Sequence, residues 1–215
     1  MPVHLVLASA SPARRSLLTR AGVDPTVVVS DVDEDAVLTA QREREPDLAP
    51  GEMALLLARA KAEMVAGELT AAGVDGAGDG HLVLGCDSVF ELDGQVHGKP
   101  GTKDVAVTRW RAMRGRRGTL HTGHWLIDDR RYGSAGAVGA SASTSVCFAQ
   151  VSDSEIEDYV ASGEPLTVAG AFTLEGRAAP FIEGIEGDPS NVMGLSLPLL
   201  RRLLIGLGLT VADLR

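Results

Sequence analysis

The chain has 215 residues, of which 45% are hydrophobic and 23% charged, as is typical of a globular protein with a sizeable core. Its formal charge of −9 argues against a general nucleic-acid or anionic-membrane surface, because proteins bind such partners through positively charged faces. No apolar run is long enough to span a membrane, no signal peptide is recognisable, and Cys86 and Cys147 form no disulfide framework, so we expect a soluble cytoplasmic protein.

Apolar runs and turn-forming residues predict the elements of the first half of the chain. They are a buried strand over 3–8, a helix over 12–21, a strand over 26–30 and a long helix over about 51–72. Ser11 followed by Pro12 is a strong helix start, and Gly22 is a usual residue at a helix end. The acidic cluster 31–35 is as compatible with a solvated loop as with a ligand site. Residues 73–80 predict a flexible loop.

The second half continues the alternation of strands and helices. The predicted strands are 82–85, 89–92, 95–97, 119–128, 137–151, 171–174 and 181–185, and the predicted helices are 102–113, 152–162 and 197–207. Asp93-Gly94 predicts a tight hairpin turn, and residues 128–130 predict a second turn. No repeat or low-complexity linker divides the chain, so we expect a single domain over residues 1–215, of the α/β class with a mixed sheet.

The start of the first predicted helix has the features of an anion site. A helix N-terminus carries unpaired N–H groups and a partial positive charge, and the small Ser9 and Ser11 allow an anion to approach it. Arg14 lies in the first turn, where a cation opposes the helix dipole but supplies a planar fork that matches phosphate oxygens. The alternative is an exposed arginine pair on an ordinary surface helix, and the S-x-S-P motif alone does not exclude it.

Three further charged residues are candidates for chemistry. Asp87 is predicted at the end of an apolar strand, where a carboxylate can hold a divalent metal, accept a proton from water, or simply cap the following turn. Lys61 lies in a largely apolar helix, so its ammonium group either meets an anion or extends to water. Lys99 follows the hairpin that begins at Asp87. The five histidines show no metal-ligand spacing.

Together these segments resemble the Maf family, the septum-formation-inhibitor-like nucleoside triphosphate pyrophosphatases. The matching motifs are S-x-S-P-x-R at 9–14, L-A-x-x-K-A at 57–62, G-x-D at 85–87, G-K-P at 98–100, G-E-P at 163–165, A-G at 169–170, E-G at 175–176, and the run from Gly187-Asp188 to Gly194-Leu195. They follow the family order over nearly the whole chain, so a chance likeness is improbable.

The resemblance implies a two-lobed, inosine-triphosphatase-like α/β fold with a mixed sheet and a central cleft, commonly in a homodimer. It implies hydrolysis of a nucleoside triphosphate to the monophosphate and pyrophosphate with a divalent metal cation (Mg, Mn or Co), and a role in nucleotide-pool sanitation and cell-division arrest. It identifies Asp87 as the proton acceptor and, with Glu34, as a metal ligand. The residues that it assigns to the triphosphate are Ser9, Ser11, Arg14, Lys61 and Lys99.

The base preference stays open, because three positions depart from the family branches. Ala13, Ser88 and Glu175 stand where the branch for thymidine and uridine triphosphates has arginine, threonine and glutamine. Glu175 resembles the branch that prefers a methylated guanosine triphosphate, but Ala13 and Ser88 match neither branch. Two other classes remain as alternatives: a nucleotide-sensing regulator of cell division with little catalysis, and a nucleotidyltransferase. The intact charged motifs argue against the first, and the lack of a Gly-rich loop at 8–16 argues against the second.

Overall fold

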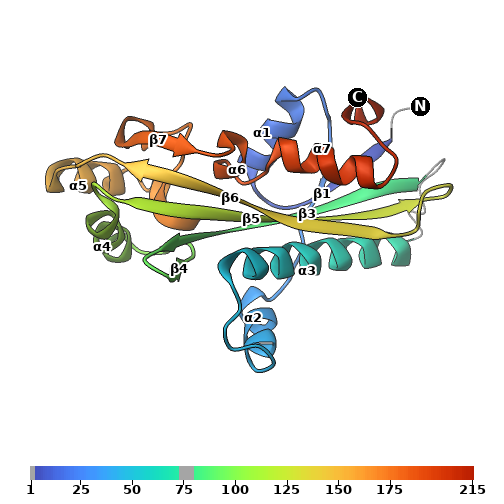
Figure 1. The fold of residues 1–215 in the computed structure, drawn as a ribbon, viewed down its shortest axis with the longest axis horizontal. Helices are drawn as coiled ribbons and strands as arrows, with labels where there is room; N and C mark the ends of the chain where they lie inside the picture. Colours follow the sequence, from blue (N-terminus) through green and yellow to red (C-terminus); the bar gives the residue numbers. More distant parts are fainter. Residues whose placement is uncertain (1–2, 73–79) are drawn as a thin grey trace.

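The computed structural model describes residues 3–72 and 80–215, so the predicted loop at 73–80 lies almost wholly outside the described residues. A seven-stranded sheet runs along the molecule in the order β2-β1-β3-β5-β6-β7, with β4 paired to β3 (Figure 1). The strands are β1 (His4–Ala8), β2 (Thr26–Val28), β3 (Gly80–Leu92), β4 (Gln95–His97), β5 (Arg117–Arg130), β6 (Ala137–Phe148) and β7 (Ile182–Glu186). β1 is parallel to β2 and β3, and the other pairs are antiparallel, so the predicted mixed α/β class is confirmed.

Helices cover both faces of this sheet (Figure 1). They are α1 (Pro12–Arg20), α2 (Glu34–Arg42), α3 (Pro50–Ala71), α4 (Lys103–Met113), α5 (Asp153–Ala161), α6 (Pro189–Val192) and α7 (Leu197–Gly206), with 3-10 turns η1 (Glu164–Thr167), η2 (Ala169–Ala171), η3 (Ala179–Phe181) and η4 (Val211–Leu214). α3 lies on one face, whereas α1 and α7 lie on the other. None of the helices within 3–72 and 80–215 is long and apolar enough to cross a membrane.

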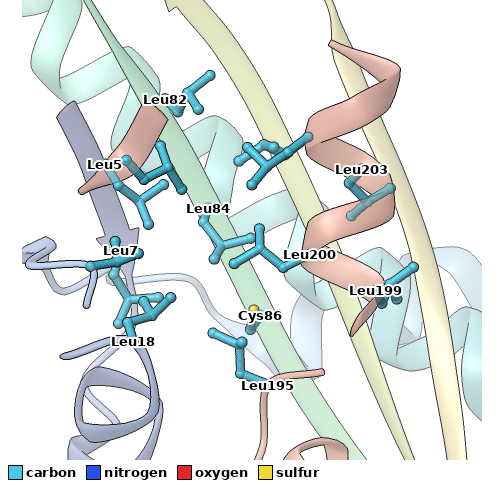
Figure 2. Packing of buried hydrophobic residues seen from close by; sticks show 14 of the residues in the cluster. Leu5, Leu7, Leu18, Leu82, Leu84, Cys86, Leu195, Leu199, Leu200 and Leu203 are labelled. Carbon is cyan, nitrogen blue, oxygen red and sulfur yellow. The ribbon is translucent and has the colours of Figure 1, made fainter. Parts of the chain in front are cut away.

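Among the described residues, a small third cluster with Ala62 and Val83 packs α3 on the sheet, and two larger hydrophobic clusters pack against different halves of β3. The first is rich in leucine and joins β1, β3 and α7 through residues such as Leu5, Leu84 and Leu200 (Figure 2). The second is rich in aromatic side chains and includes Phe90 of β3 and Trp110 of α4. Each of the two larger clusters is the core of one lobe, and the long strands β3, β5 and β6 run through both lobes. The predicted two-lobed arrangement is therefore confirmed.

Two glycines bring α3 into direct contact with the sheet. A Cβ atom on Gly85 of β3 would lie 2.0 Å from the carbonyl oxygen of Ala58, and one on Gly123 of β5 would lie 2.2 Å from that of Ala54. Only glycine permits such an approach, because even a methyl group would overlap the helix backbone. This close packing places Lys61 of α3 beside Asp87, two residues beyond Gly85 on the same face of β3.

We expect Gly85→Ala to destabilise the fold by at least about 2 kcal/mol, because the new methyl group must push α3 away from the sheet. Chemical denaturation measures this loss. Gly67→Ala is the control, because Gly67 lies on α3, the helix that packs against Gly85, and its Cβ would meet nothing within 4 Å. The control should leave stability unchanged or raise it by about 0.5–1 kcal/mol through helix propensity. Equal effects of the two substitutions would contradict the argument.

The structure corrects two predicted strand ends. β3 does not stop before Asp87 but continues to Leu92, so Asp87 lies in the interior of a strand. The continuous pairing of β3 with β5 maintains the extended conformation through this polar segment. β5 likewise extends to Arg130, so the turn predicted at 128–130 lies farther along the chain, at 131–136. The buried carboxylate of Asp128 stabilises this turn, because it accepts hydrogen bonds from Arg130 and Ser134.

The acidic cluster 31–35, for which the sequence leaves both a solvated loop and a ligand site open, is only partly a loop, because the side chain of Asp33 caps α2 and Glu34 begins that helix. One further strand prediction was wrong. The predicted strand at 171–174 is absent, because η2 occupies residues 169–171 and both Gly170 and Ala171 have a positive φ. A positive φ is incompatible with an extended strand. In contrast, Asp93 and Gly94 form the predicted tight turn between β3 and β4, both with positive φ.

Candidate functional site

A gap in the strand pairing of β3 marks the candidate site. β5 pairs with one edge of β3 over residues 80–91, whereas the other edge pairs with β1 only over 81–85 and with β4 only over 90–92. Residues 86–89 therefore have no strand partner on that edge among the described residues. Asp87 and Ser88 lie in this gap and point to opposite faces of the sheet, because side chains alternate along a strand.

A cavity of about 650 Å³ opens at this gap, between the two lobes. The segment that follows β1, the start of α2, the middle of α3 and the edge of β3 line the cavity, together with residues from 164–176 and 192–194. Every residue that the sequence singled out lines the cavity: Ser9, Ser11, Ala13, Arg14, Glu34, Lys61, Asp87, Ser88, Lys99 and Glu175. The segments that follow β1 and β2 converge at this cavity, because the two strands are parallel and their carboxyl ends lie at the same edge of the sheet.

Arg14 is buried at this cavity and is held by uncharged partners. Its Nε donates to the carbonyl oxygen of Gly194 (2.7 Å), Nη1 to Oγ of Ser9 (3.0 Å) and Nη2 to Oγ of Ser88 (3.1 Å). None of these partners carries a charge, and Arg14 forms no ion pair with a carboxylate of residues 3–72 and 80–215. A buried guanidinium without a counter-ion is unfavourable unless an anion binds beside it. The cavity therefore offers an anion a fixed planar cation.

Lys61 joins the two carboxylates of the site. Its Nζ lies 2.5 Å from Oδ1 of Asp87 and 2.6 Å from Oε1 of Glu34. Burial raises the pKa of Asp87, and the nearby Lys61 and Arg14 charges oppose this rise only in part. Burial also acts to raise the pKa of Glu34, but the hydrogen bond and the charge of Lys61, with the charges of Lys99 and Arg14, lower it below its usual value. The site thus combines the Glu34 carboxylate, whose lowered pKa favours the ionised form, with the Asp87 carboxylate, whose raised pKa makes it the stronger base.

The remaining candidates differ in exposure. Ser11 caps α1, and its Oγ accepts from the N–H of Arg14 (3.5 Å), while its own N–H donates to Oγ of Ser9 (3.2 Å). Ala13 and Ser88 are half-buried, whereas Lys99 is exposed at the cavity. Glu175 is also exposed, and its Oε2 lies 3.6 Å from Nη1 of Arg20 at the end of α1.

A family model described as Maf-like protein matches residues 4–207 of the chain. The chain belongs to the Maf family.

Curated relatives of this Maf chain carry a common name. A protein of Streptomyces coelicolor named nucleoside triphosphate pyrophosphatase is 56% identical over 211 residues, covering 98% of this chain and 94% of the relative. One of the same name from Leifsonia xyli is 53% identical over 201 residues, covering 94% and 91%. A solved nucleoside-triphosphatase / dITP/XTP pyrophosphatase structure from Mycobacterium abscessus covers 69% of this chain and 76% of its own, at 14% identity and a TM-score of 0.33, a likeness too slight to carry an argument.

The sequence did not predict the residues of this Maf chain that support Arg14 through hydrogen bonds. Oγ of Ser88, which accepts from Arg14, lies 2.9 Å from Oγ1 of Thr122, and that hydroxyl donates to the carbonyl oxygen of Asn191 (3.2 Å). Gly194 accepts from Arg14 with a φ of +97°, and a Cβ there would lie 3.2 Å from Nε of Arg14. The turn-forming residues of 187–198 predict a structured loop. They do not predict that Gly194 of this loop contacts Arg14, which lies 180 residues earlier in the chain.

A divalent cation fits the donor set of the site only with help from a ligand. Within the described part of the chain, no cluster of three or more histidine, cysteine, aspartate or glutamate side chains is suited to hold a metal alone. Glu34 and Asp87 nevertheless both point toward one cation, the ammonium group of Lys61. Two carboxylates completed by phosphate oxygens and water are a usual environment for Mg²⁺. The residues therefore fit a metal that arrives with a phosphorylated substrate.

Proposed function

We propose that this Maf chain is a nucleoside triphosphate pyrophosphatase that converts a nucleoside triphosphate and water to the monophosphate and pyrophosphate. The observation that carries the proposal is a buried arginine that has no carboxylate partner among the described residues, in the same cavity as a buried, lysine-paired aspartate. The names of relatives at 53% and 56% identity over nearly the whole chain support the same activity.

Arg14, Ser9, Ser11, Lys61 and Lys99 hold the triphosphate in this proposal. Arg14 is oriented before any anion arrives, because three hydrogen bonds fix its guanidinium plane. The N-terminus of α1 adds backbone N–H groups and a partial positive charge beside it. An oriented cation stabilises the charge that develops on phosphate oxygens without reorganising during the reaction. Arg14 in the first turn of α1 opposes the helix dipole, and the bound anion offsets this unfavourable interaction.

Asp87 is the general base. It accepts a proton from a water molecule whose oxygen attacks the α-phosphorus, the bond from the α-phosphorus to the bridging oxygen breaks, and pyrophosphate leaves with the electron pair. Burial raises the pKa of Asp87, which makes its carboxylate a stronger base, while Lys61 at 2.5 Å favours the ionised form. The hydrogen bond from Lys61 also fixes the direction in which the carboxylate points.

Glu34 and Asp87 would hold a divalent cation (Mg, Mn or Co) together with the triphosphate. The charged side chains that line the cavity supply three cations and four carboxylates: Arg14, Lys61 and Lys99 against Glu34, Asp87, Glu164 and Glu175. A triphosphate brings about four more negative charges, so the protein alone does not balance it. When bound, a divalent cation supplies that balance and polarises phosphoryl oxygens.

In this proposal Glu175 contacts the base, whereas Ala13 and Ser88, which lie beside Arg14, influence base selection through the way the nucleotide is seated. Arg14, Lys61 and Lys99 mark the phosphate end of the cavity, so the sugar and base extend toward residues 172–176, which also line it. Glu175 is exposed there, and its carboxylate accepts hydrogen bonds from a donor edge such as that of guanine while repelling an acceptor carbonyl.

The cellular setting that we propose is a cytoplasmic homodimer that sanitises the nucleotide pool and restrains cell division. Family resemblance supports the dimer and the role. Cys86 and Cys147 are both free thiols, which supports a reducing compartment. Burial raises the pKa of Cys86 to about 12, so this thiol is unreactive despite its position beside Asp87.

Product analysis tests the proposed activity. We expect pyrophosphate and a monophosphate, and no single orthophosphate, from at least one member of a panel of canonical and modified nucleoside triphosphates with Mg²⁺, Mn²⁺ or Co²⁺. A chelator should abolish turnover, and replacement of the metal should restore it. Release of orthophosphate from the terminal position would contradict the proposal. Nucleotide binding without any turnover would instead favour a nucleotide-sensing regulator.

A further inference from the structure

The cavity lining contains a carboxylate, Glu164, to which the proposed reaction assigns no role. Glu164 follows Gly163 at the end of α5 and begins η1. Its Oε1 accepts hydrogen bonds from the hydroxyl groups of Thr173 (2.6 Å) and Tyr159 (3.1 Å), and the N–H of Arg177 lies 3.0 and 3.1 Å from its two oxygens. Burial acts to raise the pKa of Glu164, but these hydrogen bonds lower it below its usual value, so the carboxylate is ionised at neutral pH.

These contacts fix the segment that carries Glu175. Thr173 and Arg177 lie two residues before and after Glu175, and Glu164 binds both. The segment also approaches Glu164 so closely that a Cβ on Gly176 would lie 2.6 Å from Oε1 of Glu164. Residues 173–177 form no helix or strand that would otherwise hold them in place. The position of Glu175 in the cavity therefore depends on the Glu164 carboxylate.

Glu164 is itself anchored in the aromatic core. Tyr159, which donates to it, is buried on α5, and its ring packs edge-on against Trp110 of α4 with centroids 5.3 Å apart. One oxygen of Glu164 already accepts from two hydroxyl groups, and both oxygens face the N–H of Arg177. The Glu164 carboxylate is therefore occupied in holding residues 173–177. Within the part of the chain that the structure describes, the Glu175 carboxylate has only an exposed ion pair with Arg20 and is available to a ligand.

We propose that Glu164 is a positioning residue for base selection, which fixes residues 173–177 so that Glu175 faces the nucleobase. This inference rests on the proposed function, because it assumes that the base of a nucleoside triphosphate occupies this end of the cavity. Glu164 acts through Glu175 and touches neither the phosphates nor the reacting water.

The test compares Glu164→Gln with Glu175→Ala and with the double variant. Glu164→Gln removes the negative charge and places an NH2 donor at the Oε2 position, against the N–H of Arg177, while an oxygen at the Oε1 position still accepts, so the hold on residues 173–177 is weakened. The readouts are dissociation constants for guanosine and uridine triphosphates, their kcat/KM values, and the inhibition constant of inorganic tripolyphosphate, which has no base. We expect each single variant to shift the ratio between the two bases by about tenfold, and the double variant to add nothing further.

The same variants should leave the tripolyphosphate constant within about twofold of the wild-type value, because the phosphate end is untouched. An unchanged base ratio in Glu164→Gln, additive shifts in the double variant, or an equal weakening of tripolyphosphate would overturn the inference. Tyr159→Phe and Thr173→Val each remove a single donor without changing the shape much. They should shift the base ratio in the same direction by about threefold, which keeps the test decisive if Glu164→Gln does not fold.

Binding and turnover separate failure of this inference from failure of the proposed function. A wild-type chain that binds triphosphates without releasing pyrophosphate would overturn the proposed activity, while the base ratio of the dissociation constants would still test Glu164. A chain that releases pyrophosphate with a base ratio insensitive to Glu164 would overturn this inference alone.

Discussion

Asp87→Asn should lower kcat by about a thousandfold while the chain still binds its nucleotide. The substitution keeps the size of the side chain and its ability to accept a hydrogen bond from Lys61, but an amide does not take a proton from water. Affinity for the nucleotide without metal, measured in the presence of a chelator, should be equal or greater, because removal of a negative charge at the cavity relieves repulsion of the triphosphate. Steady-state kinetics and a nucleotide-binding measurement on the same preparation separate the two effects.

Asp129→Asn is the matched control for this prediction. Asp129 lies on the neighbouring strand β5 at the far end of the β3–β5 pair, opposite His81, and it does not line the cavity. Its substitution should leave kcat and KM within about twofold of the wild-type values. Retention of more than about a tenth of the wild-type kcat in Asp87→Asn would remove Asp87 from the role of general base.

Arg14→Lys should lower kcat/KM by about a hundredfold although it keeps the positive charge. A lysine has no planar fork, so it does not reproduce the simultaneous hydrogen bonds to Gly194, Ser9 and Ser88. The loss should be visible in both KM and kcat, because an arginine oriented in advance binds the phosphates and also stabilises charge in the transition state. Thermal unfolding should be measured alongside, because the buried carbonyl oxygen of Gly194 loses its donor.

Arg15→Lys provides a control of the same chemistry one residue away. Arg15 is exposed on α1 and does not line the cavity, so its substitution should leave the kinetic constants unchanged. If Arg14→Lys and Arg15→Lys behaved alike, the effect would reflect net charge on α1 rather than the oriented guanidinium. That outcome would contradict an anion site at Arg14.

Local signals were sufficient to predict most elements of the fold. Ser11 before Pro12 and the Asp93-Gly94 turn each act within a few residues and form as the sequence predicts, and the helix predicted over 152–162 forms as α5. Predictions failed where tertiary contacts decide the outcome. β3 continues through Asp87 because β5 pairs with it on the other edge, which no local pattern reveals.

The candidate site was predictable for its charged residues but not for their supports. Lys61 and Asp87 stood out because charges in apolar segments need a reason to be there, and they lie 2.5 Å apart. Thr122, Asn191 and Glu164 are common polar residues whose importance depends on partners in distant segments or on the fold of a loop. A sequence pattern identifies the unusual residue, whereas the residues that orient it are ordinary and become visible only in three dimensions.

Hydrolysis in water enriched in ¹⁸O tests the central claim most directly, because it shows which phosphorus the water attacks. Attack at the α-phosphorus, which the roles proposed for Asp87 and Arg14 require, puts the label in the nucleoside monophosphate and leaves the pyrophosphate unlabelled. Mass spectrometry of the two products should show this pattern. Label in the pyrophosphate, or in free orthophosphate, would contradict the account.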